Sequence, residues 1–294
     1  MTIAEAVAAG SRFVTAPDGL RLHALDYAVA GGATPVLCLT GLARTSADFA
    51  PLAEALASGR HGPARRVVAL DYRGRGRSER EAAGVYDMMV ENADILAVAT
   101  ALELHEAIVV GTSRGGLHAM ILGATRPTLL RGVVLNDIGP RIETAGLVRI
   151  RGYVGKLPQP GDIDDAIALL KTTSGAQFTG LSEAEWRLFA ETTWETQESG
   201  LVPRYDPRLS QGLATLDLDK PLPELWKQFE ALAHVPLLAL RGENSDLLAP
   251  ATVEEMLRRH RRAQALTVPG QGHAPLLADA PTIEAVCRFV AGCD

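Results

Sequence analysis

Short apolar runs alternate with longer segments of helical periodicity along the first part of the chain. Residues 49–57 and 87–104 carry apolar side chains at helical spacing. Around these two segments lie short, mainly apolar runs of the length expected for buried strands, at residues 36–40, 67–70, 108–110 and 133–135. Strands that alternate with helices of this length predict βαβ units and a mostly parallel sheet.

An antiparallel hairpin is predicted before the first of these units. Two strand-like runs, residues 13–16 and 20–28, are joined by Pro17-Asp18-Gly19. Proline presets φ for a turn and glycine accepts positive φ, so this tripeptide favours a tight reversal of the chain.

The alternation stops near residue 140. The next 90 or so residues show no convincing strand and instead contain four helix-like pieces, at residues 144–155, 163–172, 183–198 and 224–232. Ser182 and Glu185 form a capping box before the third piece. The α/β rhythm then resumes with residues 235–240, 250–259, 266–268 and 281–291. We therefore predict a core of residues 1–140 and 234–294 and a helical insertion of residues 141–233.

Composition and charge argue against two kinds of partner, nucleic acids and membranes. The chain has 294 residues and a formal net charge of -6, which argues against nucleic-acid binding. No apolar run approaches the roughly 20 residues that span a bilayer. Residues 1–14 have neither a basic leader nor a long apolar run. We expect a cytoplasmic protein that acts on a small molecule, without a membrane or nucleic-acid partner; the sequence leaves its oligomeric state open.

A candidate nucleophile lies where a strand gives way to a helix. Residues 111–115 read Gly-Thr-Ser-Arg-Gly, the pattern G-x-S-x-G, and follow the apolar run 107–110. A helix-compatible run, residues 115–125, follows. Glycines allow the sharp turn of a nucleophile elbow, which would expose the Ser113 hydroxyl at its tip.

A base for this serine is also present. A serine hydroxyl is a poor nucleophile without an adjacent base. Of the seven histidines, only His273 lies in a glycine-rich loop directly after a strand-like run. We expect this loop to bring the imidazole to the same sheet edge as Ser113.

These motifs occur in an order that resembles the α/β-hydrolase superfamily, specifically its small-molecule serine hydrolases with a helical cap. The resemblance covers almost the whole chain and rests on Thr40-Gly41-Leu42, on Asp-Tyr-Arg-Gly-Arg-Gly-Arg-Ser at 71–78, on the elbow at 111–115, on Arg-Gly-Glu-Asn-Ser-Asp at 241–246 and on Gly-Gln-Gly-His at 270–273. It implies a mostly parallel eight-stranded sheet flanked by helices, an inserted helical cap or lid, and a Ser-His-Asp triad.

Two carboxylates compete for the role of the triad acid. Asp246 follows the strand after the insertion and precedes His273, which gives the order Ser, Asp, His. Asp137, after the strand before the insertion, is the alternative, because some members of the superfamily place the acid there. We favour Asp246.

The residues beside the elbow carry two further predictions. The backbone N–H groups of Leu42 and Arg114 would form the oxyanion hole. The Arg114 side chain either binds a substrate carboxylate or forms a structural salt bridge with a core carboxylate such as Asp137 or Glu143, and we favour the salt bridge.

Two other groups of residues allow a structural and a functional interpretation. Trp186, Phe189 and Trp194 would share one helix face, which either packs the insertion onto the core or also lines an apolar substrate pocket. For the arginines at 73, 75 and 77 we expect a loop fixed by arginine hydrogen bonds rather than a phosphate site.

Taken together, these features predict a serine hydrolase that cleaves a small carboxylic ester or lactone through an acyl-enzyme. Hydrolytic cleavage of a C–C bond in a dienoic or diketone substrate is the alternative chemistry. A non-catalytic receptor for a small ligand is the alternative class, since the fold supports all three. No Cys/His or His/carboxylate cluster has the spacing of metal ligands, so we expect neither a metal nor another cofactor.

Overall fold

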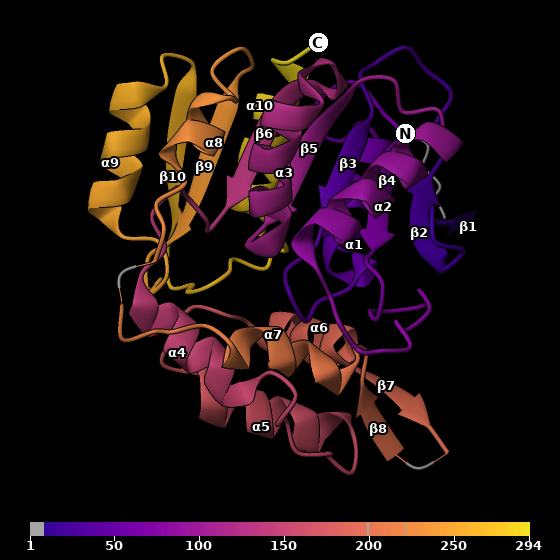
Figure 1. The fold of residues 1–294 in the computed structure, drawn as a ribbon, viewed down its shortest axis with the longest axis vertical. Coiled ribbons are helices and arrows are strands. Elements are labelled where there is room, and N and C mark those ends of the chain that lie inside the picture. Colours follow the sequence, from indigo (N-terminus) through magenta and orange to yellow (C-terminus); the bar gives the residue numbers. More distant parts are fainter. Residues whose placement is uncertain (1–8, 199, 221) are drawn as a thin grey trace.

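A computed structural model describes residues 9–198, 200–220 and 222–294 of the chain, so residues 1–8 of the amino-terminal segment considered above lie outside it. Its central feature is an eight-stranded sheet with the order β1-β2-β4-β3-β5-β6-β9-β10 (Figure 1). Within this sheet, β1–β2 and β2–β4 are antiparallel and the other pairs are parallel. The predicted mostly parallel sheet and its opening hairpin are confirmed. The strands are β1 (Gly10–Thr15), β2 (Arg21–Tyr27), β3 (Val36–Leu39), β4 (Val67–Asp71), β5 (Ala107–Thr112), β6 (Leu130–Asn136), β9 (Leu237–Gly242) and β10 (Ala263–Val268).

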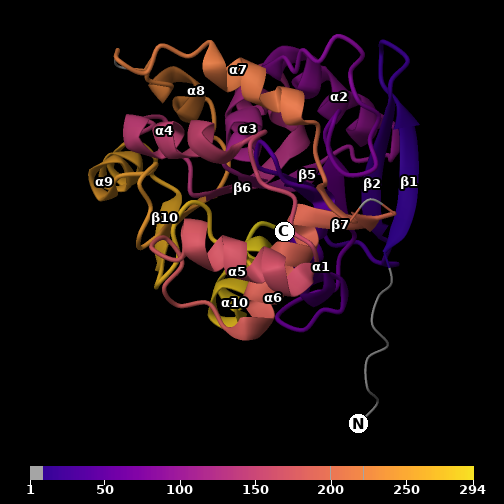
Figure 2. The ribbon, with the colours of Figure 1, turned by 90° about the horizontal axis from the view of Figure 1, so that it is seen from below.

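The central strands are continuous apolar runs because helices cover both faces of the sheet. In β3, Leu37 and Leu39 pack into one apolar core, and Val36 and Cys38 pack into the other. Viewed from below, α1 and α10 lie on the opposite face from α2 and α3 (Figure 2). The core helices are α1 (Ala50–Ala57), α2 (Met88–Ala101), α3 (Arg114–Thr125), α8 (Trp226–Glu230), α9 (Pro250–Arg259) and α10 (Ala280–Ala291), with short 3-10 turns at Ser46–Phe49 and Pro127–Leu129. A further 3-10 turn, Pro207–Leu209, lies in the inserted segment.

The inserted segment lies below the carboxyl ends of the central strands (Figure 1). The Ser182 hydroxyl accepts from the Glu185 N–H, and the Glu185 carboxylate accepts from the Ser182 N–H, so the predicted capping box is present. The elements are α4 (Thr144–Tyr153), α5 (Ile163–Ser174), α6 (Glu183–Thr193), β7 (Trp194–Gln197), β8 (Gly200–Pro203) and α7 (Ser210–Ala214).

The prediction of a purely helical insertion is wrong at one place. The helix expected over 183–198 ends at Thr193, and β7 pairs with β8 as an antiparallel hairpin. The helix ends in a run of β-branched and aromatic residues, Thr192, Thr193 and Trp194, which favour extended structure over helix.

The predicted carboxyl-terminal boundary of the insertion is also wrong. The Leu225 N–H donates to the Pro140 carbonyl oxygen at 2.7 Å, so the chain returns to the core before α8 rather than at residue 234. Phe229 of α8 is fully buried in the same core as α3. Next to α8, Leu232 packs so closely on α3 that a β-carbon at Gly123 would lie 2.5 Å from its side chain.

Candidate active site

The strand–turn–helix around Ser113 has the geometry that the G-x-S-x-G pattern predicts. Ser113 sits between β5 and α3 with a φ of 50°, a strained conformation for a residue other than glycine. A β-carbon at Gly115 would lie 2.0 Å from the Leu39 carbonyl oxygen, and one at Gly111 would lie 2.5 Å from the Gly115 backbone. Only glycine fits at these two positions, and the turn they permit lifts the Ser113 hydroxyl away from the sheet.

His273 faces this hydroxyl from the loop after β10. Its Nε2 lies 2.9 Å from Ser113 Oγ, and its side chain is 6% exposed. The inserted segment contributes to its placement, because the His273 N–H donates to the Gln177 side-chain oxygen at 3.1 Å. The structure therefore brings the predicted nucleophile and the predicted base within hydrogen-bonding distance.

The carboxylate against His273 is Asp137, not Asp246. His273 Nδ1 lies 2.8 Å from Asp137 Oδ2. Asp137 follows β6 and is fully buried, and it accepts hydrogen bonds from the Gly242 N–H at 2.7 Å and the Ser245 hydroxyl at 2.6 Å. The 241–246 loop, which we expected to supply the acid, instead supplies donors that hold the Asp137 carboxylate in place.

The Asp246 carboxylate is paired with an arginine of the insertion. Its two oxygens accept from Nε and Nη2 of Arg149 of α4 at 2.7 and 2.8 Å. Burial opposes ionisation of Asp246, but the hydrogen bond and charge of Arg149 outweigh burial and lower its pKa. Our preference for Asp246 over Asp137 is therefore corrected by the geometry.

A cavity of about 270 Å³ opens at Ser113 and His273, between the core and the inserted segment. Gly41 and Leu42 of the loop after β3 line it from the core side. The walls from the insertion are mainly apolar and include Ile150, Val154, Leu170, Phe178, Leu188 and Phe189. A concave, largely apolar site with a few convergent polar groups is typical of small-molecule binding.

The three aromatic residues singled out in the sequence have different positions. Phe189 lines the cavity. Trp186 and Trp194 are buried in the apolar cluster of the insertion and are absent from the cavity lining among the described residues. Trp186 packs against Phe189 with ring centroids 6.2 Å apart. Trp186 therefore supports Phe189 of the cavity wall from behind, and Trp194 belongs to the same apolar cluster.

Two arginines line the cavity, and each is paired with a carboxylate. Arg149 binds Asp246, as described above. Arg44 donates to Asp48 at 2.6 Å and to the hydroxyls of Thr192 and Thr193 at the end of α6. Arg44 thus connects the loop beside Ser113 to the insertion. Sequence reasoning did not single out Arg44, Arg149 or Gln177, because partners such as Thr192, Asp246 and His273 are distant along the chain.

The Arg114 side chain is turned away from the cavity. Its Nε donates to Glu91 of α2 at 2.6 Å. The salt-bridge interpretation therefore fits the structure, although the partner is neither Asp137 nor Glu143. Arg114 is the first residue of α3. Neither its backbone N–H nor that of Leu42 has a hydrogen-bond acceptor among the residues that the structure describes.

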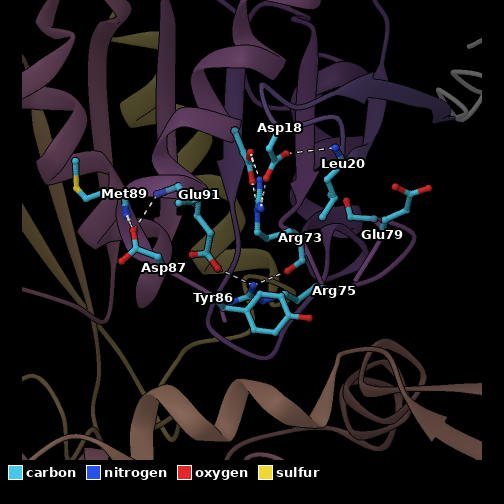
Figure 3. Close-up of polar contacts among 12 residues, drawn as sticks. Asp18, Leu20, Arg73, Arg75, Glu79, Tyr86, Asp87, Met89 and Glu91 are labelled. Carbon is cyan, nitrogen blue, oxygen red and sulfur yellow. Dashed lines mark hydrogen bonds and ion pairs between the residues drawn. The ribbon is translucent and has the colours of Figure 1, made fainter. Parts of the chain in front are cut away.

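The predicted arginine-fixed loop is confirmed. Arg73 binds Asp94 of α2 at 2.6 and 2.7 Å and Asp18 at 2.7 Å (Figure 3). Arg75 is buried and donates to Glu91 at 2.7 Å and to the Arg73 carbonyl oxygen at 2.6 Å. Both guanidinium groups donate to protein acceptors, and Arg75 Nη2, which has no hydrogen-bond partner among the described residues, is buried, so the loop is a structural element.

Across 9–198, 200–220 and 222–294, no group of three or more His, Cys, Asp or Glu side chains could hold a metal ion. Over the same ranges, no helix is long and apolar enough to cross a membrane.

Known proteins are similar to this chain in sequence and in fold. The family model described as alpha/beta hydrolase family matches residues 36–285. A 3-hydroxybutyrate-oligomer hydrolase from Cupriavidus necator is 34% identical over 95% of this chain and 97% of its own length. A pimeloyl-[acyl-carrier protein] methyl ester esterase from Xanthomonas campestris is 29% identical over 90% of this chain and 97% of its own.

A solved structure is also similar to this chain in both sequence and fold. The crystal structure of an alpha/beta hydrolase from Novosphingobium aromaticivorans superimposes with a TM-score of 0.87 and 34% identity, covering 98% of this chain and 99% of that one. The chain belongs to the α/β-hydrolase family and is a hydrolase of the kind that acts on carboxylic ester or related bonds.

Proposed function

We propose that this protein is a serine hydrolase that cleaves a small carboxylic ester or lactone through an acyl-enzyme. The observation that carries the proposal is the unbroken chain of contacts from Ser113 Oγ to His273 Nε2 at 2.9 Å and from His273 Nδ1 to Asp137 Oδ2 at 2.8 Å. A nucleophile, a base and a group that orients the base are the three parts that acyl transfer by serine requires.

In this proposal Ser113 attacks the acyl carbonyl carbon while His273 Nε2 takes its proton. The buried Asp137 holds the imidazole through Nδ1 and stabilises the imidazolium that forms. The N–H groups of Leu42 and Arg114 donate to the oxyanion of the tetrahedral intermediate. His273 then protonates the departing alcohol, and a water molecule activated by His273 releases the acid from Ser113.

The cavity and the relatives support a short ester with an apolar part. A cavity of about 270 Å³ with mainly apolar walls from the insertion suits a small acyl group. An oligomer of 3-hydroxybutyrate is a polyester, and the other relative is named for a methyl ester, so both relatives support cleavage of a carboxylic ester. Short esters of hydroxy acids are therefore included in the substrate test.

A substrate panel tests this function. It contains p-nitrophenyl esters of increasing chain length, a 3-hydroxybutyrate dimer, a lactone and a dienoic C–C substrate, each with wild type and Ser113→Ala. We expect multiple turnover of short esters, slower turnover of long-chain esters, and no turnover by Ser113→Ala. Turnover of the C–C substrate alone would contradict the ester assignment. Ligand-dependent stabilisation without multiple turnover would favour a receptor.

Arg114→Leu tests whether this arginine recognises substrate charge. Because its guanidinium is bound to Glu91, we expect similar losses on a neutral and an anionic ester, such as phenyl butyrate and the monophenyl ester of adipic acid. The ratio of their kcat/KM values should stay within about twofold of the wild-type ratio. A selective loss on the anionic ester would place the guanidinium in the substrate site instead.

A further inference from the structure

One buried carboxylate, Glu91 of α2, binds two arginines beneath the elbow. Glu91 Oε1 accepts from Arg75 Nη1 at 2.7 Å, and Glu91 Oε2 accepts from Arg114 Nε at 2.6 Å. The side chains of Glu91 and Arg75 are 0% exposed. Figure 3 shows Glu91 directed toward the Arg75 guanidinium, with the Tyr86 ring against it.

Each arginine leads to one of the two backbone donors proposed for the oxyanion hole. Arg114 carries one donor on its own backbone. Arg75 Nε donates to the Leu42 carbonyl oxygen at 2.8 Å, and Leu42 carries the other donor. The two donors lie on different segments of the chain, the loop after β3 and the start of α3. Through its two oxygens, Glu91 connects both segments.

The cluster has few alternative arrangements. The Arg75 guanidinium carbon lies 5.2 Å from the Tyr86 ring centroid and 5.6 Å from the Tyr72 ring centroid. His118 Nε2 lies 3.2 Å from Glu91 Oε2. Burial opposes ionisation of Glu91, but the Arg75 charge, the His118 hydrogen bond and the Arg114 charge outweigh burial and hold its pKa below the usual range. A charged carboxylate between two fixed cations gives strong, directional hydrogen bonds.

From this geometry we propose that Glu91 is a positioning residue for the oxyanion hole, which sets the relative placement of the Leu42 and Arg114 N–H groups through Arg75 and Arg114. The inference rests on the proposed function, because it concerns the same tetrahedral intermediate. Misplacing one preorganised donor removes part of the transition-state stabilisation while leaving ground-state binding nearly intact.

The same helix offers a matched control. Asp94 of α2 is also buried and also pairs bidentately with an arginine of the same loop, Arg73. Neither Asp94 nor the Arg73 side chain donates to or accepts from Leu42 or Arg114 among the described residues. Asp94→Asn therefore removes a comparable buried charge while every side chain of the proposed link stays unchanged. Its pair meets that link through the backbone, where the Arg73 carbonyl oxygen accepts from Arg75 Nη1 at 2.6 Å.

The sign of the effect separates positioning from a simple change of charge. Glu91→Gln removes a negative charge close to the developing oxyanion, which by itself would stabilise the transition state. Misplacement of the Leu42 and Arg114 N–H groups would instead destabilise the transition state and lower kcat. A fall in kcat therefore cannot come from the through-space effect of the Glu91 charge on the oxyanion. Glu91→Asp keeps the charge but is one methylene shorter, so it cannot reach both arginines at their present distances.

The experiment compares Glu91→Gln, Glu91→Asp, Asp94→Asn, Ser113→Ala and wild type with p-nitrophenyl butyrate. It also measures inhibition by a trifluoromethyl ketone, which forms a tetrahedral adduct, and by the matching methyl ketone, with melting temperatures in parallel. For both Glu91 variants we expect kcat to fall by about 10- to 100-fold, with a parallel loss of affinity for the trifluoromethyl ketone. KM and methyl ketone affinity should change by less than about twofold.

Asp94→Asn should lower the melting temperature and leave kcat within about twofold of wild type. An unchanged kcat in the Glu91 variants, or an equal fall in Asp94→Asn, would overturn the inference while leaving the proposed function intact. Wild-type turnover that does not depend on Ser113 would overturn both. If Glu91→Gln does not fold, Glu91→Asp decides between these outcomes.

Discussion

Replacing Ser113 with alanine is expected to lower kcat for p-nitrophenyl butyrate by about 10⁵- to 10⁶-fold. The substitution removes the only hydroxyl within hydrogen-bonding distance of His273 Nε2 among the described residues, so no acyl-enzyme can form. KM should change little, because the cavity walls and the backbone donors are untouched. Steady-state kinetics with a sensitive chromogenic ester measures the loss.

A matched control shows that the loss is local. Ser58→Ala removes a serine hydroxyl at the end of α1, where it donates to the Ala55 carbonyl oxygen, away from the cavity lining. This variant should retain wild-type kcat and KM. Retention of more than about a tenth of wild-type activity by Ser113→Ala would exclude the serine as nucleophile.

Asp137→Asn is expected to produce the second largest loss, about 10⁴-fold in kcat. An amide in place of the carboxylate leaves the imidazole without its charged acceptor at Nδ1 and favours the wrong tautomer. The same substitution at Asp246 should cost less than about tenfold and act mainly on KM, because it frees Arg149 at the cavity wall. Comparing the two variants tests the assignment of the acid.

The paired variants can also give the opposite ranking. A larger loss for Asp246→Asn than for Asp137→Asn would mean that the 241–246 loop rearranges during turnover and that Asp246 acts as the acid. Asp137 also accepts hydrogen bonds from Gly242 and Ser245, so its replacement removes structural contacts as well. Circular dichroism and melting temperatures of both variants therefore accompany the kinetics and show whether either loss comes from unfolding.

Local sequence signals predicted the contact between Ser113 and His273 but not the carboxylate that lies against His273. Glycines on both sides of Ser113 and in the loop before His273 are visible in the sequence, and each marks a turn at the end of a strand. Asp137 and Asp246 follow the neighbouring parallel strands β6 and β9, so the sequence places both carboxylates near the same edge of the sheet. The difference is three-dimensional. Asp137 adopts a φ of 54° directly after its strand, whereas Arg149 of the insertion binds Asp246.

The sequence predicted the core of the fold more closely than the insertion. The periodicity of the core elements gave the parallel sheet and the helices that flank it. In the insertion, apolar spacing suggested that Trp186, Phe189 and Trp194 share one helix face, but the helix ends at Thr193 and only Phe189 reaches the cavity. The sequence identified Arg114 as a salt-bridge residue. Its partner Glu91 depends on the packing of α2 against α3, which periodicity alone does not define.

In the proposed mechanism the Ser113 hydroxyl is the nucleophile. Intact-mass analysis after reaction with a fluorophosphonate, followed by peptide mapping of the phosphonylated residue, identifies a nucleophilic serine. We expect one adduct per chain on Ser113 in wild type, no adduct in Ser113→Ala, and slowed labelling in Asp137→Asn. An unlabelled wild-type protein, or an equal adduct in Ser113→Ala, would contradict this mechanism.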